Sequence, residues 1–350
     1  MQLPDARSRE ILDAIVALYV ETGRPVSSGL VELYLKRAYS SATIRIVMKQ
    51  LEERGMLEQP HTSAGRCPTD SGFRAHVDRF LGGWSLHRHE TPRSLHTLAR
   101  DDVRRAAGSQ GQVKALALLL SKLTDNISII LGPNWETARA QRIELFPRGE
   151  RRVLLVVILD SAPVQTGLVQ LETDHPARVV ADAAALLSER VSGHTVAEIR
   201  DGLLDNLDLV LTPATACAAG VMRAGRDLWR DLAAGEVELQ GVANVLDEPE
   251  FREPEPLKDL IRIMESPRSL RRSLAHLCGT VQSDFGVWIG HENPVDRLRG
   301  FSVLTGRFEL EGRPGVLAVL GPRRMAYVRA FHGIDVFRRA TREFSAQPAN

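Results

Sequence analysis

Residues 40–69 read SSATIRIVMKQLEERGMLEQPHTSAGRCPT, a helix signal followed by a turn signal. Either Ser40 or Ser41 can cap the free backbone amides of a helix that runs to about Arg54. The inward face of this helix carries Ile44, Met48 and Leu51, with Val47 beside them. Gly55 is expected to end the helix, because glycine adopts the left-handed conformation common there.

A hairpin is expected directly after this helix. Residues 56–60 suit an extended segment, residues 61–65 are a small polar tip with a glycine, and residues 66–69 return along the first segment. Thr69 or Asp70 then caps another helix. The apolar side of that helix carries Phe73, Val77, Phe80 and Leu81.

Two more helices are expected before this segment. Residues 7–22 place their apolar side chains on one wide helical stripe. Ser27 or Ser28 opens a second helix that continues to about Leu35. Three helices followed by a hairpin are the architecture of a winged helix-turn-helix, so residues 1–82 are predicted to be a DNA-binding domain.

The chemistry of DNA reading follows from this geometry. The third helix of such a domain enters the major groove with its N-terminus first, so its first outward side chains meet the base edges. Those side chains are Ser41, Ala42, Thr43, Arg45, Ile46 and Lys49, and the hairpin, or wing, adds His61, Thr62, Ser63, Gly65 and Arg66. Arg45 has the fork of donors that recognises guanine, and Ser40 with the helix N-terminus offers amides to a phosphate. The alternative is a protein-interaction module in which Arg45 and Lys49 are simply solvated.

The overall charge gives no independent support for DNA binding. The 350 residues hold 45 Lys and Arg against 44 Asp and Glu, a net charge of +1. Residues 1–82 hold eleven basic and ten acidic side chains. Any DNA contact must therefore come from the placement of a few cations and not from a broad positive field.

Several classes of protein have no matching motif in this chain. No GxxxxGK[ST] phosphate loop, HExxH motif or GxSxG elbow is present, so we expect no enzyme activity and no cofactor. Cys67, Cys217 and Cys278 lie far apart without a CxxC pair, which predicts neither a disulfide framework nor a metal site. No apolar segment resembles a signal peptide or a membrane span, and a cytoplasmic location is expected.

The remaining chain carries further helix and strand signals. Residues 83–110 read as a polar linker with one short helix near 94–107, followed by a core helix at 114–123. Strands are predicted at 127–131, 141–146, 153–159, 166–171, 286–289, 301–308 and 315–320, before a last helix at 325–344. Between them lie predicted helices at 179–187, 215–232 and 257–264, and a strand at 237–245. Strands on both sides of a helical stretch suggest one sheet interrupted by an insertion, placed at 173–251.

The insertion is small and rich in aliphatic residues. Such a unit is poorly sized to bury all of its apolar surface alone, which suggests an isologous dimer contact. An intrachain docking surface is the alternative, because alanine-rich helices pack in either setting.

The segment that begins at Ser40 resembles the signature of the HrcA heat-inducible repressors. The likeness covers SSATIR, LEE, the glycine at 55, LEQPHTSAGR and PT within residues 40–69. Three later blocks are also similar to family motifs: NVLD at 244–247 with PEF at 249–251, IGHENP at 289–294 and LGPRRMAY at 320–327. Together they extend the resemblance from about residue 7 to about residue 340.

The resemblance implies a homodimeric repressor of chaperone operons of the groE and dnaK type. Members bind an inverted-repeat operator as dimers, depend on a groEL-type chaperonin, and release repression when heat occupies that chaperonin. The implied fold is α+β and multidomain. It comprises a winged helix at 1–82, a discontinuous GAF-like domain at 83–172 and 252–350, and a dimerising α/β domain inserted at 173–251.

The chain departs from the family pattern beside Arg45. Ile46 and Val47 stand where the family usually has Asn-Asp. Val47 suits the inward face, whereas Ile46 should point outward, where it can touch a thymine methyl but cannot hydrogen-bond. A diverged operator is the first explanation and weakened binding is the second. Cys67 replaces an aliphatic residue and is expected to serve packing rather than redox chemistry.

Two alternatives concern the C-terminal half. A GAF-like domain could gate DNA binding by sensing a small molecule, although no cluster of polar residues names a ligand. His291 and Glu292 are expected in a turn after a strand, where they cap the loop. A contact with a ligand or with the chaperonin is the alternative role for these two residues.

Overall fold

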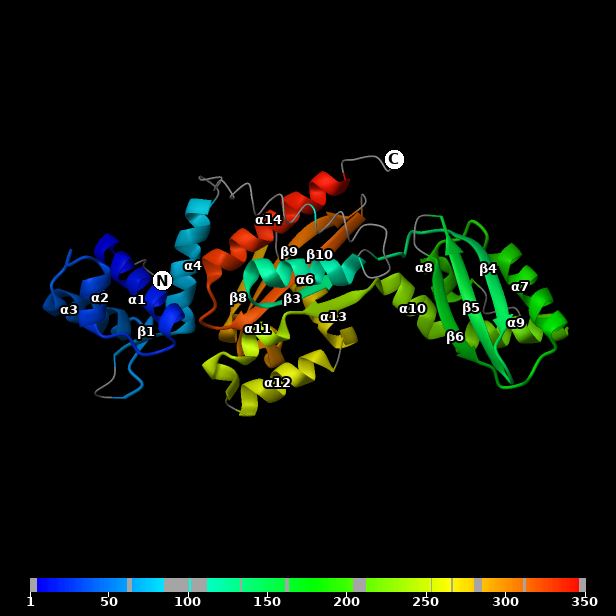
Figure 1. Ribbon diagram of the computed structural model, residues 1–350, viewed down its shortest axis with the longest axis horizontal. Coiled ribbons are helices and arrows are strands. Elements are labelled where there is room, and N and C mark those ends of the chain that lie inside the picture. The colour runs from blue at the N-terminus through cyan, green and yellow to red at the C-terminus, as the bar shows by residue number, and fades with distance from the viewer. Residues whose placement is uncertain are drawn as a thin grey trace. The chain divides into compact units, whose positions relative to one another are not determined.

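The computed structural model describes residues 5–61, 65–84, 101, 112–132, 134–160, 164–203, 212–252, 254–265, 267–279, 285–310 and 313–345. The chain forms two compact units. Unit 1 combines Met1–Leu131 with Val237–Asn350, and unit 2 is Gly132–Glu236 (Figure 1). Unit 1 is discontinuous in sequence because unit 2 is inserted between β3 (Ile127–Leu131) and β7 (Val237–Gln240), two strands that pair with each other.

Unit 1 begins with helices α1 (Ala6–Thr22), α2 (Ser28–Tyr34) and α3 (Ser41–Glu53). The two short strands β1 (Leu57–Glu58) and β2 (Cys67–Pro68) then pair antiparallel. Helix α4 (Asp70–Trp84) follows directly. The order of elements is the one that the sequence pattern predicts for this segment.

The second part of unit 1 is an antiparallel sheet of five strands in the order β7-β3-β10-β9-β8. Its strands are β3 (Ile127–Leu131), β7 (Val237–Gln240), β8 (Phe285–Ile289), β9 (Phe301–Leu310) and β10 (Arg313–Pro322). Helices α6 (Gln112–Thr124) and α14 (Tyr327–Ser345) pack on one face (Figure 1). The opposite face is covered by α11 (Val242–Leu246), α12 (Pro254–Met264) and α13 (Pro267–Gly279).

The alternation of side chains along the central strands explains these three layers. In β10, Leu317 and Val319 join the core under α6 and α14. Their neighbours Ala318 and Leu320 join the core under α12 and α13. Because successive residues of a strand point to opposite faces, a strand that is apolar at every position must be covered on both sides.

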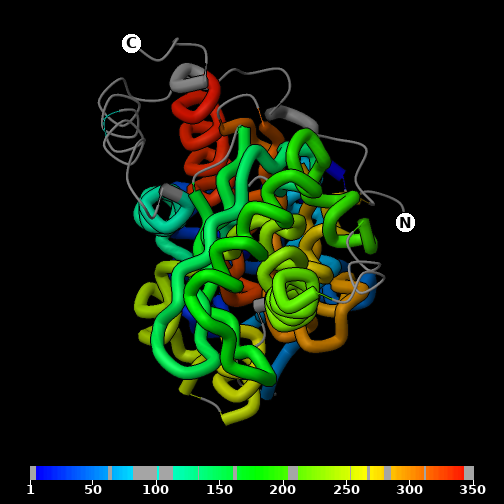
Figure 2. The backbone as a smooth tube through the Cα atoms, turned by 90° about the vertical axis from the view of Figure 1, so that its right-hand side faces the viewer, coloured from blue at the N-terminus to red at the C-terminus, as the bar shows by residue number. Residues whose placement is uncertain are grey.

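Unit 2 has two layers. A separate antiparallel sheet, in the order β4-β5-β6, consists of β4 (Ala140–Pro147), β5 (Arg152–Leu159) and β6 (Gln165–Gln170). Its helices are α7 (Ala177–Val191), α8 (Val196–Glu198), α9 (Pro213–Ala224) and α10 (Arg226–Ala234), with a π-helical turn at Ile199–Leu203. Figure 1 shows the sheet in front of α7 and α9, and Figure 2 shows the strands on one side and these helices on the other.

The expected boundaries of the insertion were wrong. The predicted strands at 141–146, 153–159 and 166–171 do not join the large sheet but form the sheet of unit 2. The strand at the other end, β7, pairs with β3 and therefore belongs to the host and not to an insertion at 173–251. Alternating apolar residues predict that a segment is a strand, but they carry no information on which strand it pairs with.

Two predicted elements also end differently from the expectation. The helix predicted at 215–232 is divided into α9 and α10 at Gly225, where an added Cβ would lie 2.9 Å from the Val221 carbonyl oxygen. The strand predicted at 237–245 stops at Gln240, and α11 begins after Gly241, which has a φ of 83°. The short helix predicted near 94–107 lies outside the described residues, apart from Asp101.

Membrane-spanning helices and metal-binding clusters are both absent from the described residues. No helix there has the length and apolar character needed to cross a membrane. Within the same residues, no group of three or more His, Cys, Asp or Glu side chains is arranged to hold a metal ion.

Candidate nucleic-acid interface

The start of α3 is held by three hydroxyl groups. Ser40 is the cap, because its Oγ accepts a hydrogen bond from the Thr43 backbone N–H at 3.2 Å. The Ser41 Oγ instead lies 2.8 Å from the Ser28 Oγ of α2. The first turn of α3 is therefore tied to α2, which gives the two helices a defined relative orientation.

The two faces of α3 differ sharply in burial. Its inward residues are buried and pack in the core that α3 shares with α1: Ile44, Val47, Met48 and Leu51. Its outward residues Ala42, Arg45, Ile46 and Lys49 are exposed. Ile46 is 61% exposed whereas Val47 is 5% exposed, which confirms the predicted directions of these two unusual residues.

Arg45 is oriented by α2. Its Nε donates a hydrogen bond to the Ser28 Oγ at 3.1 Å, while the residue as a whole stays exposed. One hydroxyl thus contacts both Arg45 and the capped start of α3. A guanidinium held at its Nε loses less side-chain freedom when its fork meets an acceptor.

A groove of about 610 Å³ lies beside α3, between α2 and the segment that leads into β2. Its lining includes Ser28, Arg45, Lys49, Glu52 and Arg66. The groove brings together predicted contact residues from α3 and from the wing.

Arg66 is engaged by an acidic neighbour within this groove. Its Nε donates to Glu52 Oε2 at 2.9 Å, and its side chain is only 20% exposed. The sequence pattern predicted Arg66 at the DNA surface but gave no sign of the pairing with Glu52. Any contact of Arg66 with a phosphate would have to share or break this ion pair.

The wing is fixed by a backbone pair at its base. Val26 and Arg66 exchange both N–H···O bonds at 2.9 Å. Gly65 packs so closely on this pair that an added Cβ would lie 2.3 Å from the Val26 carbonyl oxygen. Gly65 therefore has a structural reason to be glycine. His61 is exposed, and the predicted contacts Thr62 and Ser63 lie outside the described residues.

Two cations near α3 had no assigned role in the sequence pattern. Lys36 and Arg37, in the turn between α2 and α3, are exposed and have φ values of 50° and 62°. Residues other than glycine rarely adopt this left-handed backbone conformation, and two such residues in succession are unusual. No pattern in the letters Lys-Arg predicts a left-handed turn, which is why these residues were missed.

Cys67 serves packing in β2. It is buried, and burial is the main reason why its pKa is raised above the ordinary thiol value. Burial likewise raises the pKa of its neighbour Tyr19 to about 12. A thiol with a raised pKa holds little of the reactive thiolate at neutral pH, which fits the expected packing role.

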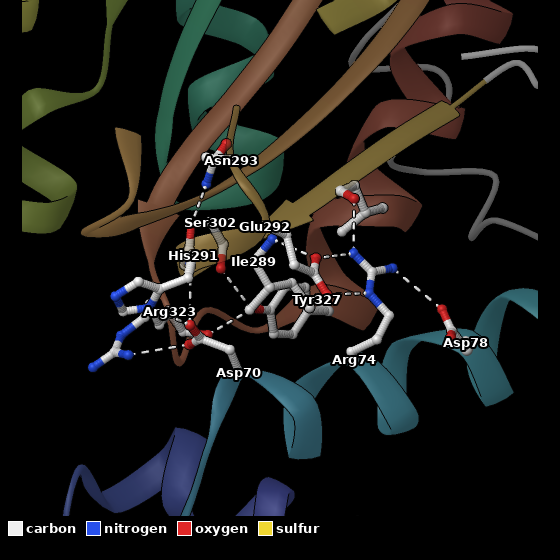
Figure 3. A network of polar contacts seen from close by, with 12 residues as sticks. Asp70, Arg74, Asp78, Ile289, His291, Glu292, Asn293, Ser302, Arg323 and Tyr327 are labelled. Carbon is white, nitrogen blue, oxygen red and sulfur yellow. Dashed lines mark hydrogen bonds and ion pairs between the residues drawn. The ribbon is translucent and has the colours of Figure 1, made fainter. Parts of the chain in front are cut away.

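His291 and Glu292 contact α4 and are no part of the α3 surface (Figure 3). Glu292 Oε2 accepts from the Ile289 backbone N–H at 2.9 Å, so the expected capping of this turn is confirmed. The contacts with Asp70 and Arg74 of α4, more than 200 residues away in sequence, were not predicted.

A family model described as the HrcA protein C terminal domain matches residues 111–331, more than half of the chain. The chain belongs to the HrcA family. Heat-inducible transcription repressor HrcA of Natranaerobius thermophilus is 33% identical over 324 residues and covers 92% of each chain. The protein of the same name from Desulforudis audaxviator is 32% identical over 338 residues, covering 93% of both.

The fold also has a counterpart among solved structures. The crystal structure of a hypothetical protein matches with a TM-score of 0.65 at 24% identity, and the match covers 99% of both chains. This likeness supports the mixed α/β fold. The relatives carry the name of a transcription repressor, which agrees with the expectation that this chain is not an enzyme.

Replacing Gly65 with alanine should destabilise the N-terminal part of this HrcA chain. The added methyl group would collide with the Val26 backbone, and such overpacking typically costs about 1–3 kcal/mol. Urea unfolding of the full chain measures the change. The matched control is Gly29→Ala in α2, where an added Cβ has no heavy atom within 4 Å. Equal stability of the two variants would show that the wing base does not pack as described.

Proposed function

We propose that this HrcA protein represses transcription by binding operator DNA, with residues 1–82 as a winged helix and α3 as its reading helix. The observation that carries the proposal is the exposed row of Ala42, Arg45, Ile46 and Lys49 on a Ser40-capped helix beside a short hairpin. A capped helix has the features needed to meet base edges when its first turn carries small side chains and an arginine points outward. The names of the curated relatives support the same function.

We propose that Arg45 recognises a base by hydrogen bonds and that Ile46 recognises one by apolar contact. The fork of Arg45 suits the O6 and N7 atoms of guanine, and Ile46 suits the methyl group of thymine. Because Ile46 has no hydrogen-bonding group, we propose an operator that differs from the usual family site at the facing base pair. Ser40, Ser41, Thr43 and the wing residues His61, Thr62, Ser63, Gly65 and Arg66 would then contact or approach the sugar-phosphate backbone.

We further propose that unit 2 carries the homodimer contact, with its boundaries corrected to 132–236. The face of its sheet turned away from α7 and α9 carries a row of apolar side chains. Phe146, Leu154 and Leu168 are directly paired across β4, β5 and β6. Phe146 is 44% exposed and Leu168 is 60% exposed. A contiguous exposed apolar row is typical of a contact surface, and two copies related by a two-fold axis would cover it with the same residues.

The wider regulation is proposed from family membership. The operator would be an inverted repeat in front of chaperone genes of the groE or dnaK type, in the cytoplasm where bacterial DNA lies. A groEL-type chaperonin would keep the repressor active, and heat would relieve repression by occupying that chaperonin.

We also propose that the five-stranded sheet with its helices is the GAF-like domain. Neither the family match nor the names of the relatives favour the ligand-gated alternative. A cavity between α12, α13 and the Asp296–Leu298 turn has a volume of about 10 Å³, room for at most about one water molecule.

Arg45→Ala tests the reading role. On the preferred inverted repeat, the variant should lose about 1–3 kcal/mol of binding free energy per half-site and discriminate poorly at one base pair in each half-site. Fluorescence anisotropy with a set of single-base-pair operator variants measures both effects, at a fixed salt concentration. Arg262→Ala removes the same charge from α12, where the side chain is 65% exposed, and should bind as the wild type does. If Arg45→Ala keeps wild-type discrimination at every position, Arg45 does not read a base.

Leu168→Asp tests the dimer surface. A charge in the middle of the apolar row would have to be buried at the interface, so the fraction of dimer in analytical ultracentrifugation should fall strongly. Leu246→Asp in unit 1 is the matched control, since Leu246 is also an exposed leucine, at 44%. A Leu168→Asp protein that sediments as the wild-type dimer would place the interface elsewhere, and a monomeric wild type would contradict the homodimer itself.

A further inference from the structure

Helix α4 is joined to the large sheet by a network of charged groups (Figure 3). Asp70, the first residue of α4, accepts hydrogen bonds from the His291 backbone N–H at 3.0 Å and from Arg323 Nη1 at 3.1 Å. One turn later, Arg74 donates from Nε to Glu292 Oε1 at 2.8 Å and from Nη2 to the Val287 carbonyl at 2.7 Å. The side chains of Asp70 and Arg74 are 17% and 24% exposed, so both are largely shielded from water.

The turn at residue 290 is shaped to receive the Asp70 carboxylate. Gly290 has a φ of 53°, and an added Cβ would lie 2.2 Å from Asp70 Oδ2. Although burial raises the pKa of Asp70, the hydrogen bonds from His291 and the charge of Arg323 outweigh it and leave the pKa below its ordinary value. Asp70 is therefore a charged acceptor at neutral pH, and each of its bonds is charge-assisted.

A second group of polar contacts, centred on Arg324, ties α1 to the rest of unit 1. We call this group and the α4 network the two joints. Its Nη1 donates to the Val20 carbonyl of α1 at 3.0 Å. Its Nε donates to Glu250 Oε1 at 2.7 Å, and its Nη2 bonds Glu248. The side chain is only 9% exposed. One buried guanidinium thus holds the end of α1 against the segment that follows α11.

Both joints are directional, which an apolar contact is not. Apolar packing also links the two parts, since the ring centroids of Phe73 and Tyr327 are 6.0 Å apart. Apolar surfaces tolerate sliding and repacking, whereas forked hydrogen bonds between charged groups fix distance and angle together. The joints therefore restrict how α1 to α4 can turn relative to the sheet of the same chain.

We propose that Asp70, Arg74 and Arg324 are positioning residues for two-site DNA binding. They hold α3 in one orientation to the sheet of unit 1, which removes one of the motions that would vary the separation of the two reading helices in a dimer. The inference rests on the proposed function as an operator-binding dimer. When the first half-site is bound, a fixed orientation raises the effective concentration of the second reading helix at its half-site, and a loose joint lowers it.

The consequence separates positioning from reading. A loosened joint leaves the surface of α3 unchanged, so binding to a single half-site should keep its affinity. Binding to the inverted repeat should weaken, and its dependence on the spacing between half-sites should become shallower. A general loss of structure would lower both affinities together.

The experiment compares three joint variants with the wild type: Asp70→Asn, Arg74→Gln and Arg324→Gln. The probes are duplexes that carry the inverted repeat selected by the wild-type protein from a random-sequence pool. Matched duplexes carry one half-site only, or the repeat with its spacing changed by one to ten base pairs. Circular dichroism shows that each variant is folded, and Asp70→Asn and Arg74→Gln remain informative if Arg324→Gln does not fold.

The control is Arg329→Ala. Arg329 lies on α14 and pairs with Asp125 at 2.9 Å, with both side chains more than half exposed. It contacts neither α1 nor α4 in the interactions of the described residues. We expect this variant to match the wild type on all three kinds of duplex.

We expect the joint variants to lose at least about tenfold affinity for the inverted repeat, to keep half-site affinity within about twofold, and to tolerate altered spacing better. Equal losses on both probes would assign the joints a purely structural role and overturn the proposal. Unchanged or tighter binding to the inverted repeat would overturn it as well. A wild-type protein that selects no sequence and binds no duplex would instead contradict the proposed function.

Discussion

The apolar face of α4 is buried against the sheet part of unit 1, and much of the molecule depends on that burial. Phe80 lies 5.6 Å from Phe331 of α14 between ring centroids, and Phe73 lies between Tyr19 of α1 and Tyr327. One continuous core therefore runs from α1 and α3 through α4 to α14 and β9. The N-terminal helices are consequently not an independent domain on a flexible linker. Their stability and orientation are coupled to a sheet whose strands come from the other end of the chain.

The charged joints at Asp70, Arg74 and Arg324 fix the orientation of α1 and α4 relative to the sheet of unit 1. Burying charged groups is expensive unless each has a partner, so the network gains little stability overall, but removing any single partner leaves another charge unsatisfied. Breaking one of these contacts therefore costs more free energy than the intact network contributes to folding. Unit 2 differs, because its core is closed by its own helices and the other face of its sheet carries exposed apolar residues, which we propose as the dimer contact.

Much of the fold could be predicted from residue patterns, and the reasons for success and failure are physical. The cap at Ser40 and the inward Val47 follow from local rules that act within one helical turn. The partners of β4, β5 and β6 do not, because strand pairing depends on contacts between distant segments, and the insertion was misplaced as a result. The pairing of Arg66 with Glu52 and of Asp70 with His291 is likewise a tertiary outcome. The left-handed turn at Lys36 and Arg37 has no signature in the residue types at all.

In the proposed complex, α3 lies in the major groove and Arg45 meets a guanine there. Methylation interference tests it most directly, because dimethyl sulfate modifies the N7 atom of guanine, which faces the major groove. DNA bound by the wild-type protein should be depleted of methylated guanine at two positions related by the symmetry of the inverted repeat. The same positions should lose their effect with the Arg45→Ala protein. Bound DNA that retains methylated guanine in full proportion at every position would contradict the proposed contact of Arg45 with guanine.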